Sequence, residues 1–345
     1  MPESTRRKRE ITVVIPTRQR RDAVGRALAA LEIQTLPADA YEVVVSVDGS
    51  TDGTLEMLDE LELPFRLQVA STGGRGRAVA RNVALALAEG EMVVILDDDM
   101  QVVPEFLERH LSQHPAGSRR CVMGAVPVQI TDGSPHAARH IAANFEAHLE
   151  RLAQPDHVFA PRDFYSGNFS IPADLLREVG GFDENFDTYG NEDVELGVRL
   201  RAAGVDFAYD ARAEAQQEYA KQLHELAEDT LAKGVTTVLL ARTHPDLFSL
   251  LRLAAPSESS RPWLAARSVL LWLTRRWTRL PGLIFRLAQR AESAGLWRQP
   301  LFYRAVLDYA FWAGVDRSLA RDSDGGPLAL LGEQLHRGPL SLLLH

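Results

Sequence analysis

The chain has 345 residues, 46% hydrophobic and 25% charged, which is typical of a globular protein with one or two domains. Its formal net charge of −9 excludes general nucleic-acid binding, which needs an excess of Lys and Arg, and its one cysteine, Cys121, excludes an internal disulfide. The basic N-terminus is not followed by a signal-peptide core, and no apolar run of about eighteen residues occurs. We therefore expect a cytoplasmic protein, at most peripheral on the inner face of a membrane.

Buried, β-branched runs alternate with helical patterns up to residue 100. The expected strands are 11–16, 41–50, 65–71 and 91–100, and the expected helices are 22–33, 54–61 and 77–90, the last stopped by Gly90. This alternation predicts a doubly wound α/β fold with a mostly parallel sheet. Ligands of such sheets bind beyond the carboxyl ends of the strands, where polar residues gather: Thr17, Arg18, Asp48 to Asp52, and Asp97 to Asp99.

The pattern changes after about residue 120. A strand is expected at 121–130 and helices at 136–153 and 192–203, and from about 222 onward the chain is helical in character. We therefore expect one domain over 1–222, made of halves 10–100 and 101–222, and a helical region over 223–345.

Three acids, Asp97 to Asp99, follow the fourth expected strand. Because alternate residues of an extended segment point the same way, we expect Asp97 and Asp99 to face one ion while Asp98 faces elsewhere. Hard carboxylate oxygens suit Mg²⁺ or Mn²⁺ bound together with substrate phosphates. Acids in a row are more often a solvated turn, and it is the buried strand before them that favours the metal site.

Two further segments are expected at the same edge. Asp48 ends the second strand and opens the segment 48–52, where it can accept from a nucleoside, although a turn with a helix cap also explains this segment. The glycine-rich segment 73–76 opens a helix that carries Arg77 and Arg81 on one face, which suits a diphosphate. Its alternative is a flexible loop whose arginines lie in solvent.

An amphipathic helix is expected to begin at Glu192 and Asp193. Acids at this end favour the positive pole of the helix dipole, which by itself explains both residues. The same position stabilises an ionised carboxylate, as a general base near neutral pH requires. Each of these signals is weak alone, and their order along the chain makes the combination specific.

That order is carried by the segments IPTRQR, VDGSTDGT, GRGRAVARN, LDDDM, SGNFSIP, VGGFDENF and GNEDVELGVRL. Over residues 11 to about 205 the chain resembles the family 2 glycosyltransferases, which have the GT-A fold. The resemblance implies an inverting enzyme that moves a sugar from a nucleoside-diphosphate sugar, most often UDP-linked, to a hydroxyl acceptor. It makes 10–100 the nucleotide-binding half and 101–222 the acceptor half of the domain.

The resemblance also assigns roles by position. Asp193 matches the catalytic base and Glu192 its partner, while Asp99 matches the direct metal ligand and Asp97 the other acid of the metal motif. The segment 180–183 helps to shape the sugar and acceptor pocket. The residues expected to bind the nucleotide sugar are Pro16, Thr17, Arg18, Asp48, Gly49, Ser50, Arg77, Arg81, Asp97, Asp98, Gly167 and Asn168.

The chain departs from the family pattern at two places. Val47 stands where the nucleotide motif often has a further acid. Gln216 and Gln217 stand where a histidine often completes the metal or diphosphate site, and His224 follows several residues later. The third metal contact is therefore open, with a glutamine or the donor phosphates as candidates.

The region 261–290 contains seven arginines and several tryptophan and aliphatic residues, but no Asp or Glu. Arginine and tryptophan at helical spacing favour a helix that lies on an anionic membrane surface. The alternative is a helical extension packed on the catalytic domain, or a dimer contact, with the arginines in water. A membrane site would suit a lipid-linked or cell-envelope acceptor, whereas a small-molecule acceptor needs none.

Two rival functions remain. A sugar-nucleotide pyrophosphorylase would need glycines after the first strand, which IPTRQRRDAV lacks. A catalytically impaired nucleotide-sugar-binding module or partner subunit would need losses in the acidic motifs, and Gln217 is the one residue that points that way. The sequence leaves the sugar, the acceptor and the oligomeric state open.

Overall fold

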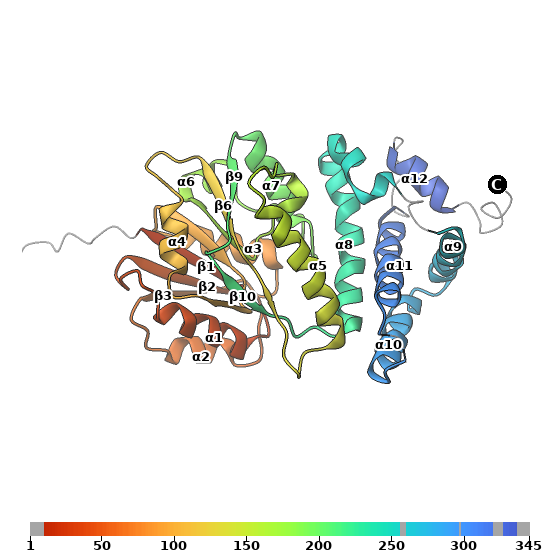
Figure 1. Ribbon diagram of the computed structural model, residues 1–345, viewed down its shortest axis with the longest axis horizontal. Coiled ribbons are helices and arrows are strands. Elements are labelled where there is room, and N and C mark those ends of the chain that lie inside the picture. Colours follow the sequence, from red (N-terminus) through yellow and green to blue (C-terminus); the bar gives the residue numbers. More distant parts are fainter. Residues whose placement is uncertain (1–9, 256–259, 297, 320–326, 337–345) are drawn as a thin grey trace, which may run out of the picture. The chain divides into compact units, whose positions relative to one another are not determined.

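A computed structural model describes residues 10–255, 260–296, 298–319 and 327–336, and it divides the chain into two compact units (Figure 1). The first unit comprises 1–132, 141–187 and 192–219. The second comprises 133–140, 188–191 and 220–345.

The first unit is built on a seven-stranded sheet in the order β3-β2-β1-β4-β8-β6-β9. Its strands are β1 (Ile11–Thr17), β2 (Tyr41–Val47), β3 (Arg66–Ser71), β4 (Met92–Leu96), β6 (Arg120–Gly124), β8 (Asn168–Pro172) and β9 (Asp206–Asp210). Strands β1 to β4 run parallel, as do β6 and β9, and β8 is antiparallel to both β4 and β6. The sheet is mostly parallel, which confirms the predicted fold class.

Helices cover both faces of this sheet, so every residue of β1, β2 and β4 is buried and the strands are nearly all apolar. One face packs against α1 (Arg21–Glu32), α2 (Thr54–Glu60) and α4 (Phe106–Ser112). The other packs against α3 (Arg77–Leu87), α6 (Ala173–Glu178) and α7 (Glu192–Ala202). Each fully buried Val, Ile or Leu contributes about 1.5–3 kcal/mol to this core.

Strand register brings the polar strand ends together. Thr17 pairs with Val47, and the backbone N–H of Asp48 donates to the Thr17 carbonyl at 2.8 Å. Strand β4 lies on the other side of β1, with Val14 opposite Ile95. The loops after β1, β2 and β4 therefore leave the sheet at one edge, as the sequence predicts.

Two expected strands are each divided between two sheets. The segment 91–100 forms β4 and β5 (Met100–Val102), separated by the turn 97–99, and the segment 121–130 forms β6 and β7 (Val128–Gln129). Strands β5 and β7 join β10 (Ala215–Glu218) in a three-stranded sheet of order β5-β10-β7. A hydrophobic run in the sequence indicates that a segment is buried, but not which strands it pairs with. It therefore cannot show that a segment passes from one sheet to another.

Helix α3 ends at Leu87 and not at Gly90, the expected stop. Gly90 serves close packing instead, since a Cβ added there would lie 2.5 Å from the backbone nitrogen of Thr12 on β1. The first unit also holds the 3-10 turn Pro161–Asp163, and α5 spans His136–Leu152.

The second unit is helical. Its helices are α8 (Leu223–Thr243), α9 (Arg261–Arg276), α10 (Leu280–Ser293), α11 (Pro300–Leu319) and α12 (Pro327–His336), with 3-10 turns at Pro245–Leu250 and Arg252–Ala254. Gly234 of α8 and Gly314 of α11 let the two backbones approach, since a Cβ on Gly314 would lie 1.9 Å from the Leu231 carbonyl oxygen. None of the described helices has both the length and the apolar character needed to span a bilayer.

Candidate active site

The acidic turn after β4 is held by backbone hydrogen bonds from two neighbouring strands. The Asp97 N–H donates to the Gly167 carbonyl at 3.0 Å, and the Glu218 N–H donates to the Asp99 carbonyl at 2.9 Å. Gly167 approaches this turn closely, since an added Cβ would lie 3.3 Å from an Asp97 carboxylate oxygen. The three carboxylates are therefore fixed at the edge where β1, β2 and β4 end.

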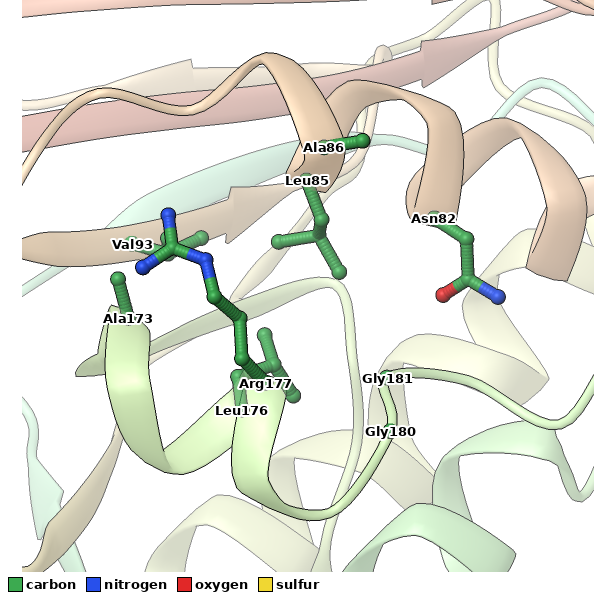
Figure 2. Close-up of a pocket in the computed structure, with 9 residues that line it drawn as sticks. All are labelled: Asn82, Leu85, Ala86, Val93, Ala173, Leu176, Arg177, Gly180 and Gly181. Atoms are coloured by element: carbon green, nitrogen blue, oxygen red, sulfur yellow. The ribbon is translucent and has the colours of Figure 1, made fainter.

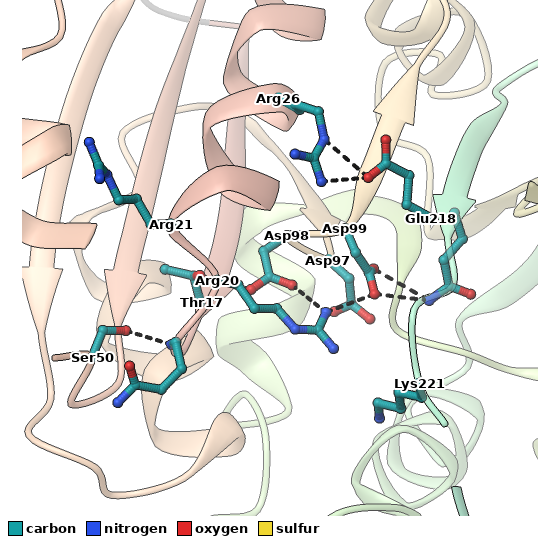
Figure 3. Close-up of polar contacts among 12 residues, drawn as sticks. Thr17, Arg20, Arg21, Arg26, Ser50, Asp97, Asp98, Asp99, Glu218 and Lys221 are labelled. Carbon is teal, nitrogen blue, oxygen red and sulfur yellow. Dashed lines mark hydrogen bonds and ion pairs between the residues drawn. The ribbon is translucent and has the colours of Figure 1, made fainter. Parts of the chain in front are cut away.

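Arg20 bridges two of these acids (Figure 3). Its Nη1 lies 3.0 Å from Asp98 Oδ1 and 2.7 Å from Asp99 Oδ2, and the Thr17 hydroxyl donates to Asp98 Oδ2 at 2.8 Å. Burial raises the pKa of Asp98 to about 6, and Arg20 opposes that rise. Burial works to lower the pKa of Arg20, but the two carboxylates outweigh it and raise that pKa above the usual value.

The expected pairing of Asp97 with Asp99 at one ion stays a prediction, and the side-chain contacts group the three acids differently. Asp98 and Asp99 form a turn directly after Asp97, so the alternation of an extended strand does not apply to these three residues. Asp98 and Asp99 share Arg20, while Asp97 binds Arg81 from helix α3. Arg20 itself was not singled out from the sequence, although it ends the loop after β1 at the same edge.

Arg81 connects the acidic turn to the start of α7. Its side chain is fully buried, with Nη2 3.0 Å from Asp97 Oδ1 and Nη1 3.2 Å from Glu192 Oε1. Arg77, one helical turn earlier, lies 4.0 Å from the same Glu192 oxygen. Burial alone would raise the pKa of Asp97, but Arg81 and Arg77 hold it below its usual value. The cluster thus contains three guanidinium groups, those of Arg20, Arg77 and Arg81, and four carboxylates.

Asp48 organises the glycine-rich loop. Its carboxylate accepts from the Thr72 hydroxyl at 2.6 Å and from the backbone N–H groups of Arg75 and Gly76 at 2.7 and 3.0 Å. Gly49 is needed beneath this loop, because its φ is +69° and an added Cβ would lie 2.8 Å from the Gly74 nitrogen. Asp48 is only 4% exposed, and its carboxylate already accepts hydrogen bonds from the loop. Its predicted contact with a nucleotide therefore stays a prediction.

The loop after β1 has a buried part and an exposed part. Pro16 and Thr17 are buried, whereas Arg18 is exposed and reaches to 3.9 Å from Asp48 Oδ2. The Ser50 hydroxyl accepts from the Gln19 N–H at 2.8 Å, which ties this loop to the one after β2. Arg18 is therefore more exposed than Arg20, the other arginine of this loop.

Asn168 faces inward, contrary to the expectation that it binds the donor. It is fully buried, and its amide nitrogen donates to the carbonyl oxygens of Ala125 at 3.0 Å and Ala213 at 2.9 Å. Both N–H groups are thus used, so the amide oxygen is the atom 2.9 Å from His110 Nε2. Strand alternation explains the outcome, since Gly167 lies at the site and its neighbour lies within the core.

A chain of hydrogen bonds continues from Asn168 into the core. Because the Asn168 oxygen accepts from His110 Nε2, His110 Nδ1 accepts from the Ser170 hydroxyl at 2.8 Å, and His114 Nε2 lies 2.7 Å from that same hydroxyl. Burial lowers the pKa of both histidines to about 4. Two neutral imidazoles therefore secure the strand end that carries Gly167.

The two acids at the start of α7 differ in their surroundings. Glu192 is buried against Arg81. Asp193 is partly exposed, and its Oδ1 accepts from the Val194 N–H at 2.8 Å. Glu192 is therefore placed to hold the arginine, and Asp193 is the more exposed of the two acids.

Gln217 occupies the position expected of a histidine. Its amide nitrogen lies 3.3 and 3.4 Å from the two Asp99 carboxylate oxygens, and β10 and β5 fix this approach by pairing Gln217 with Met100. Glu218 turns to Arg26 on α1 at 2.5 Å (Figure 3). Gln217 therefore donates its amide N–H to Asp99, where a histidine would offer an imidazole nitrogen to a metal.

The acids after β4 do not form a complete metal site by themselves in the described part of the chain. Among the described residues no group of three or more His, Cys, Asp or Glu is arranged to hold an ion. Mg²⁺ and Mn²⁺ are commonly held by one or two carboxylates together with substrate phosphates. Asp99 binds Arg20 through one carboxylate oxygen and has the Gln217 amide close by. It therefore fits a site in which a carboxylate and substrate phosphates hold the ion together, and not a site in which the protein alone holds it.

A separate pocket of about 340 Å³ lies between α3 and α6 (Figure 2). Its walls are mainly apolar, formed by Leu85, Ala86, Val93, Ala173 and Leu176. Its polar groups contact the backbone: Asn82 binds Phe182, and Arg177 donates to the Ala88 carbonyl at 2.9 Å. It contains none of the acidic residues described above.

Known proteins show the same architecture. Residues 12–177 match the glycosyl transferase family 2 model, and residues 149–224 match the N-terminal domain of galactosyltransferase. Validoxylamine A glucosyltransferase of Streptomyces hygroscopicus subsp. jinggangensis is 28% identical over 271 residues, which cover 72% of this chain and 64% of that protein. The chain thus spans less than two thirds of the length of that relative.

Two solved structures share the fold. A mannosyltransferase from Pyrobaculum calidifontis, in complex with GDP-Man and Mn²⁺, matches with a TM-score of 0.59 at 20% identity, over 91% of this chain and 88% of that one. TarS of S. aureus in complex with UDP matches with a TM-score of 0.51 at 17% identity, over 91% and 93%. The family match, the relatives and the mostly parallel sheet agree, and residues 12–177 of the chain belong to the family 2 glycosyltransferases, with the GT-A fold.

Proposed function

We propose that this chain transfers a sugar from a nucleoside-diphosphate sugar to a hydroxyl acceptor, with inversion at the anomeric carbon. The observation that carries the proposal is the cluster at the sheet edge, where Arg20 and Arg81 join Asp97, Asp98, Asp99 and Glu192. Arg81 is fully buried in this cluster, so the more exposed Arg18 and Arg77, beside the glycine-rich loop, are the arginines proposed to bind a diphosphate. Family 2 glycosyltransferases work on nucleotide-sugar donors, which supports this assignment.

The donor is proposed to be UDP-linked, with its diphosphate between the loop after β1 and the N-terminus of α3. Arg18 and Arg77 are exposed enough to reach it, while Asp48 holds the glycine-rich loop in place. Asp99 and the phosphates would together hold Mg²⁺ or Mn²⁺, with Asp97 as the neighbouring acid. A bound ion would offset the negative charge that builds on the departing diphosphate.

Asp193 is proposed as the general base that takes the proton of the acceptor hydroxyl. It lies at the N-terminal end of the eleven-residue helix α7, where the dipole favours a carboxylate, and it is partly exposed. Glu192, in the same first turn of α7 as Asp193, positions Arg81. A single displacement with one base leads to inversion, because the acceptor attacks from the face opposite to the diphosphate.

The acceptor is proposed to be a cell-envelope glycan, a glycolipid or a natural product, each of which offers a hydroxyl group. We place the protein in the cytoplasm, where nucleotide sugars are available, with peripheral contact to the inner face of a membrane. A homo-oligomer is compatible with this role and is not needed for it.

A screen of UDP-, GDP- and TDP-sugars with Mn²⁺ tests the proposal. Binding would be followed by calorimetry and donor hydrolysis by release of the nucleotide. Binding together with hydrolysis of one donor supports the enzyme. Failure of all three nucleotide classes to bind would contradict the assignment.

A second function is favoured by one observation, the contact of Gln217 with Asp99. If the amide and Arg20 keep Asp99 from an ion, the chain would bind nucleotide sugars without turning them over. The same screen separates the two, because a binding module shows calorimetric binding and no hydrolysis or transfer.

A further inference from the structure

Helices α9 and α10 expose a mixed surface of apolar and cationic side chains. We define this Arg–Trp face by the exposed residues of α9, of the 277–279 connection and of α10: Val269, Trp272, Arg276, Trp277, Arg279, Leu283, Arg286, Leu287 and Arg290. Trp277 is 64% exposed, Leu287 51% and Leu283 48%. Isolated exposed apolar residues are ordinary, but these occur at helical spacing in consecutive helices.

Two arginines of the region do not belong to this face. Arg267 is buried and binds Asp308 of α11 at 3.1 Å, and Arg275 binds Asp316 of α11 at 2.6 Å. Both therefore hold α9 onto α11. The seven arginines of 261–290 therefore do not all lie on one exposed surface.

The arginines of the Arg–Trp face have no acidic partner within the described part of the chain. Arg276 lies over the Trp272 ring, 3.9 Å from its centroid, and Arg279, Arg286 and Arg290 are exposed along α10 or just before it. The segment 261–290 has no Asp or Glu, although the whole chain has a net charge of −9. Cationic charge is thus concentrated where apolar side chains are exposed.

A partner for this face must accept both kinds of side chain. Guanidinium groups bind phosphates, whereas exposed Trp and Leu side chains gain by leaving water. A nucleic acid would satisfy the first property and not the second. The interface of an anionic phospholipid bilayer satisfies both, because tryptophan prefers the headgroup level and arginine binds the lipid phosphates.

We propose that the Arg–Trp face binds the surface of an anionic phospholipid membrane. The helices lie flat on the bilayer, with Trp272, Trp277 and the leucines of α10 at the acyl boundary and the arginines among the headgroups. This inference does not rest on the proposed catalytic function, since it uses the second unit alone.

Vesicle flotation of the full chain tests the proposal. Vesicles of phosphatidylcholine are compared with equimolar phosphatidylcholine and phosphatidylglycerol. We expect flotation with the anionic vesicles and little with the neutral ones. Each arginine contributes about fivefold to binding, so the triple variant Arg279→Gln/Arg286→Gln/Arg290→Gln is expected to bind roughly 100-fold more weakly.

A matched control removes the same charge elsewhere. Arg139, Arg304 and Arg317 are exposed and lie outside the Arg–Trp face, so their triple change to Gln should leave flotation nearly unchanged. Replacement of Trp277 by Ser should weaken flotation even at about 1 M salt, where charge attraction is screened to roughly 3 Å. Circular dichroism with thermal unfolding checks that each variant is folded.

Three results would overturn the proposal. One is the absence of flotation with the anionic vesicles, and a second is an equal loss in both triple variants. The third is self-association through this face, seen in sedimentation velocity as a dimer of the native chain that the Arg279→Gln/Arg286→Gln/Arg290→Gln variant no longer forms.

Discussion

Replacement of Arg81 by methionine tests whether a buried arginine holds the site together. Methionine keeps the length and apolar stem of the side chain and removes its charge. Arg81 is fully buried between Asp97 and Glu192, at 3.0 and 3.2 Å, so both carboxylates would lose their direct guanidinium partner. Removal of one member of a buried ion pair costs about 3–5 kcal/mol.

Arg77→Met is the matched control on the same helix. The Arg77 side chain is 40% exposed and lies 4.0 Å from Glu192, so its loss should cost below about 1 kcal/mol. The double variant Arg81→Met/Asp97→Asn should recover part of the loss, because a neutral amide needs no counter-charge. The contrast between these variants isolates charge pairing from a general effect of altering α3.

The assay must separate the two units, because unfolding of a chain with two units need not be two-state. All five tryptophans lie at 263–312 in the second unit, so their fluorescence reports that unit. Hydrogen exchange of peptides from β1, β2 and β4 reports the opening free energy of the first. A loss for Arg81→Met no larger than that for Arg77→Met would refute the reasoning.

Three further predictions follow from other parts of the structure. The pKa of His110 is lowered from 6.5 to about 4, so neutral His110 should contribute fully to stability above about pH 6.5. As the pH falls to 4, the free energy of unfolding should decrease by up to about 3 kcal/mol. Urea unfolding measured across this pH range should show the decrease in the native chain and not in His110→Gln. Gly314→Ala should destabilise the second unit by about 1–3 kcal/mol or more in tryptophan-monitored unfolding, since its Cβ would meet the Leu231 carbonyl, whereas Gly332→Ala, with open space around it, should not destabilise. Asp99→Asn should abolish binding of Mn²⁺ in the presence of UDP, measured by calorimetry; retained binding, or full activity in EDTA, would remove Asp99 from the metal site.

The sheet was predictable because its strands carry their own signal. Buried β-branched runs followed by polar residues mark β1, β2 and β4, and parallel strands place those polar residues at one edge. The division of 91–100 between two sheets was not predictable, because strand pairing depends on partners far along the chain. For the same reason the sequence pattern predicts a helix stop at Gly90, although packing against Thr12 is what requires this glycine.

The residue types of the site were predictable, but their partners were not. The sequence indicates acids after β4 and arginines on α3, yet the bridge from Arg20 to Asp98 and Asp99 depends on a turn that alternation misrepresents. Asn168 lies one residue from the site and faces the core. Sequence position gave the right strand end and not the direction of that side chain.

The C-terminal helices show the same limit. Seven arginines in 261–290 suggest one basic surface, but two of them are neutralised by acids about forty residues later on α11. A periodicity argument along one helix does not include such partners. The arginines that belong to the Arg–Trp face can be identified only once the packing of α9 on α11 is known.

Turnover of Asp193→Asn, measured beside its donor affinity, tests the central claim most directly. The amide keeps the shape of the side chain and cannot accept the acceptor proton. We predict donor binding close to that of the native chain, by calorimetry, and sugar transfer slower by roughly 10²-fold or more. Transfer at the native rate would contradict the assignment of Asp193 as the base, and with it the proposed mechanism.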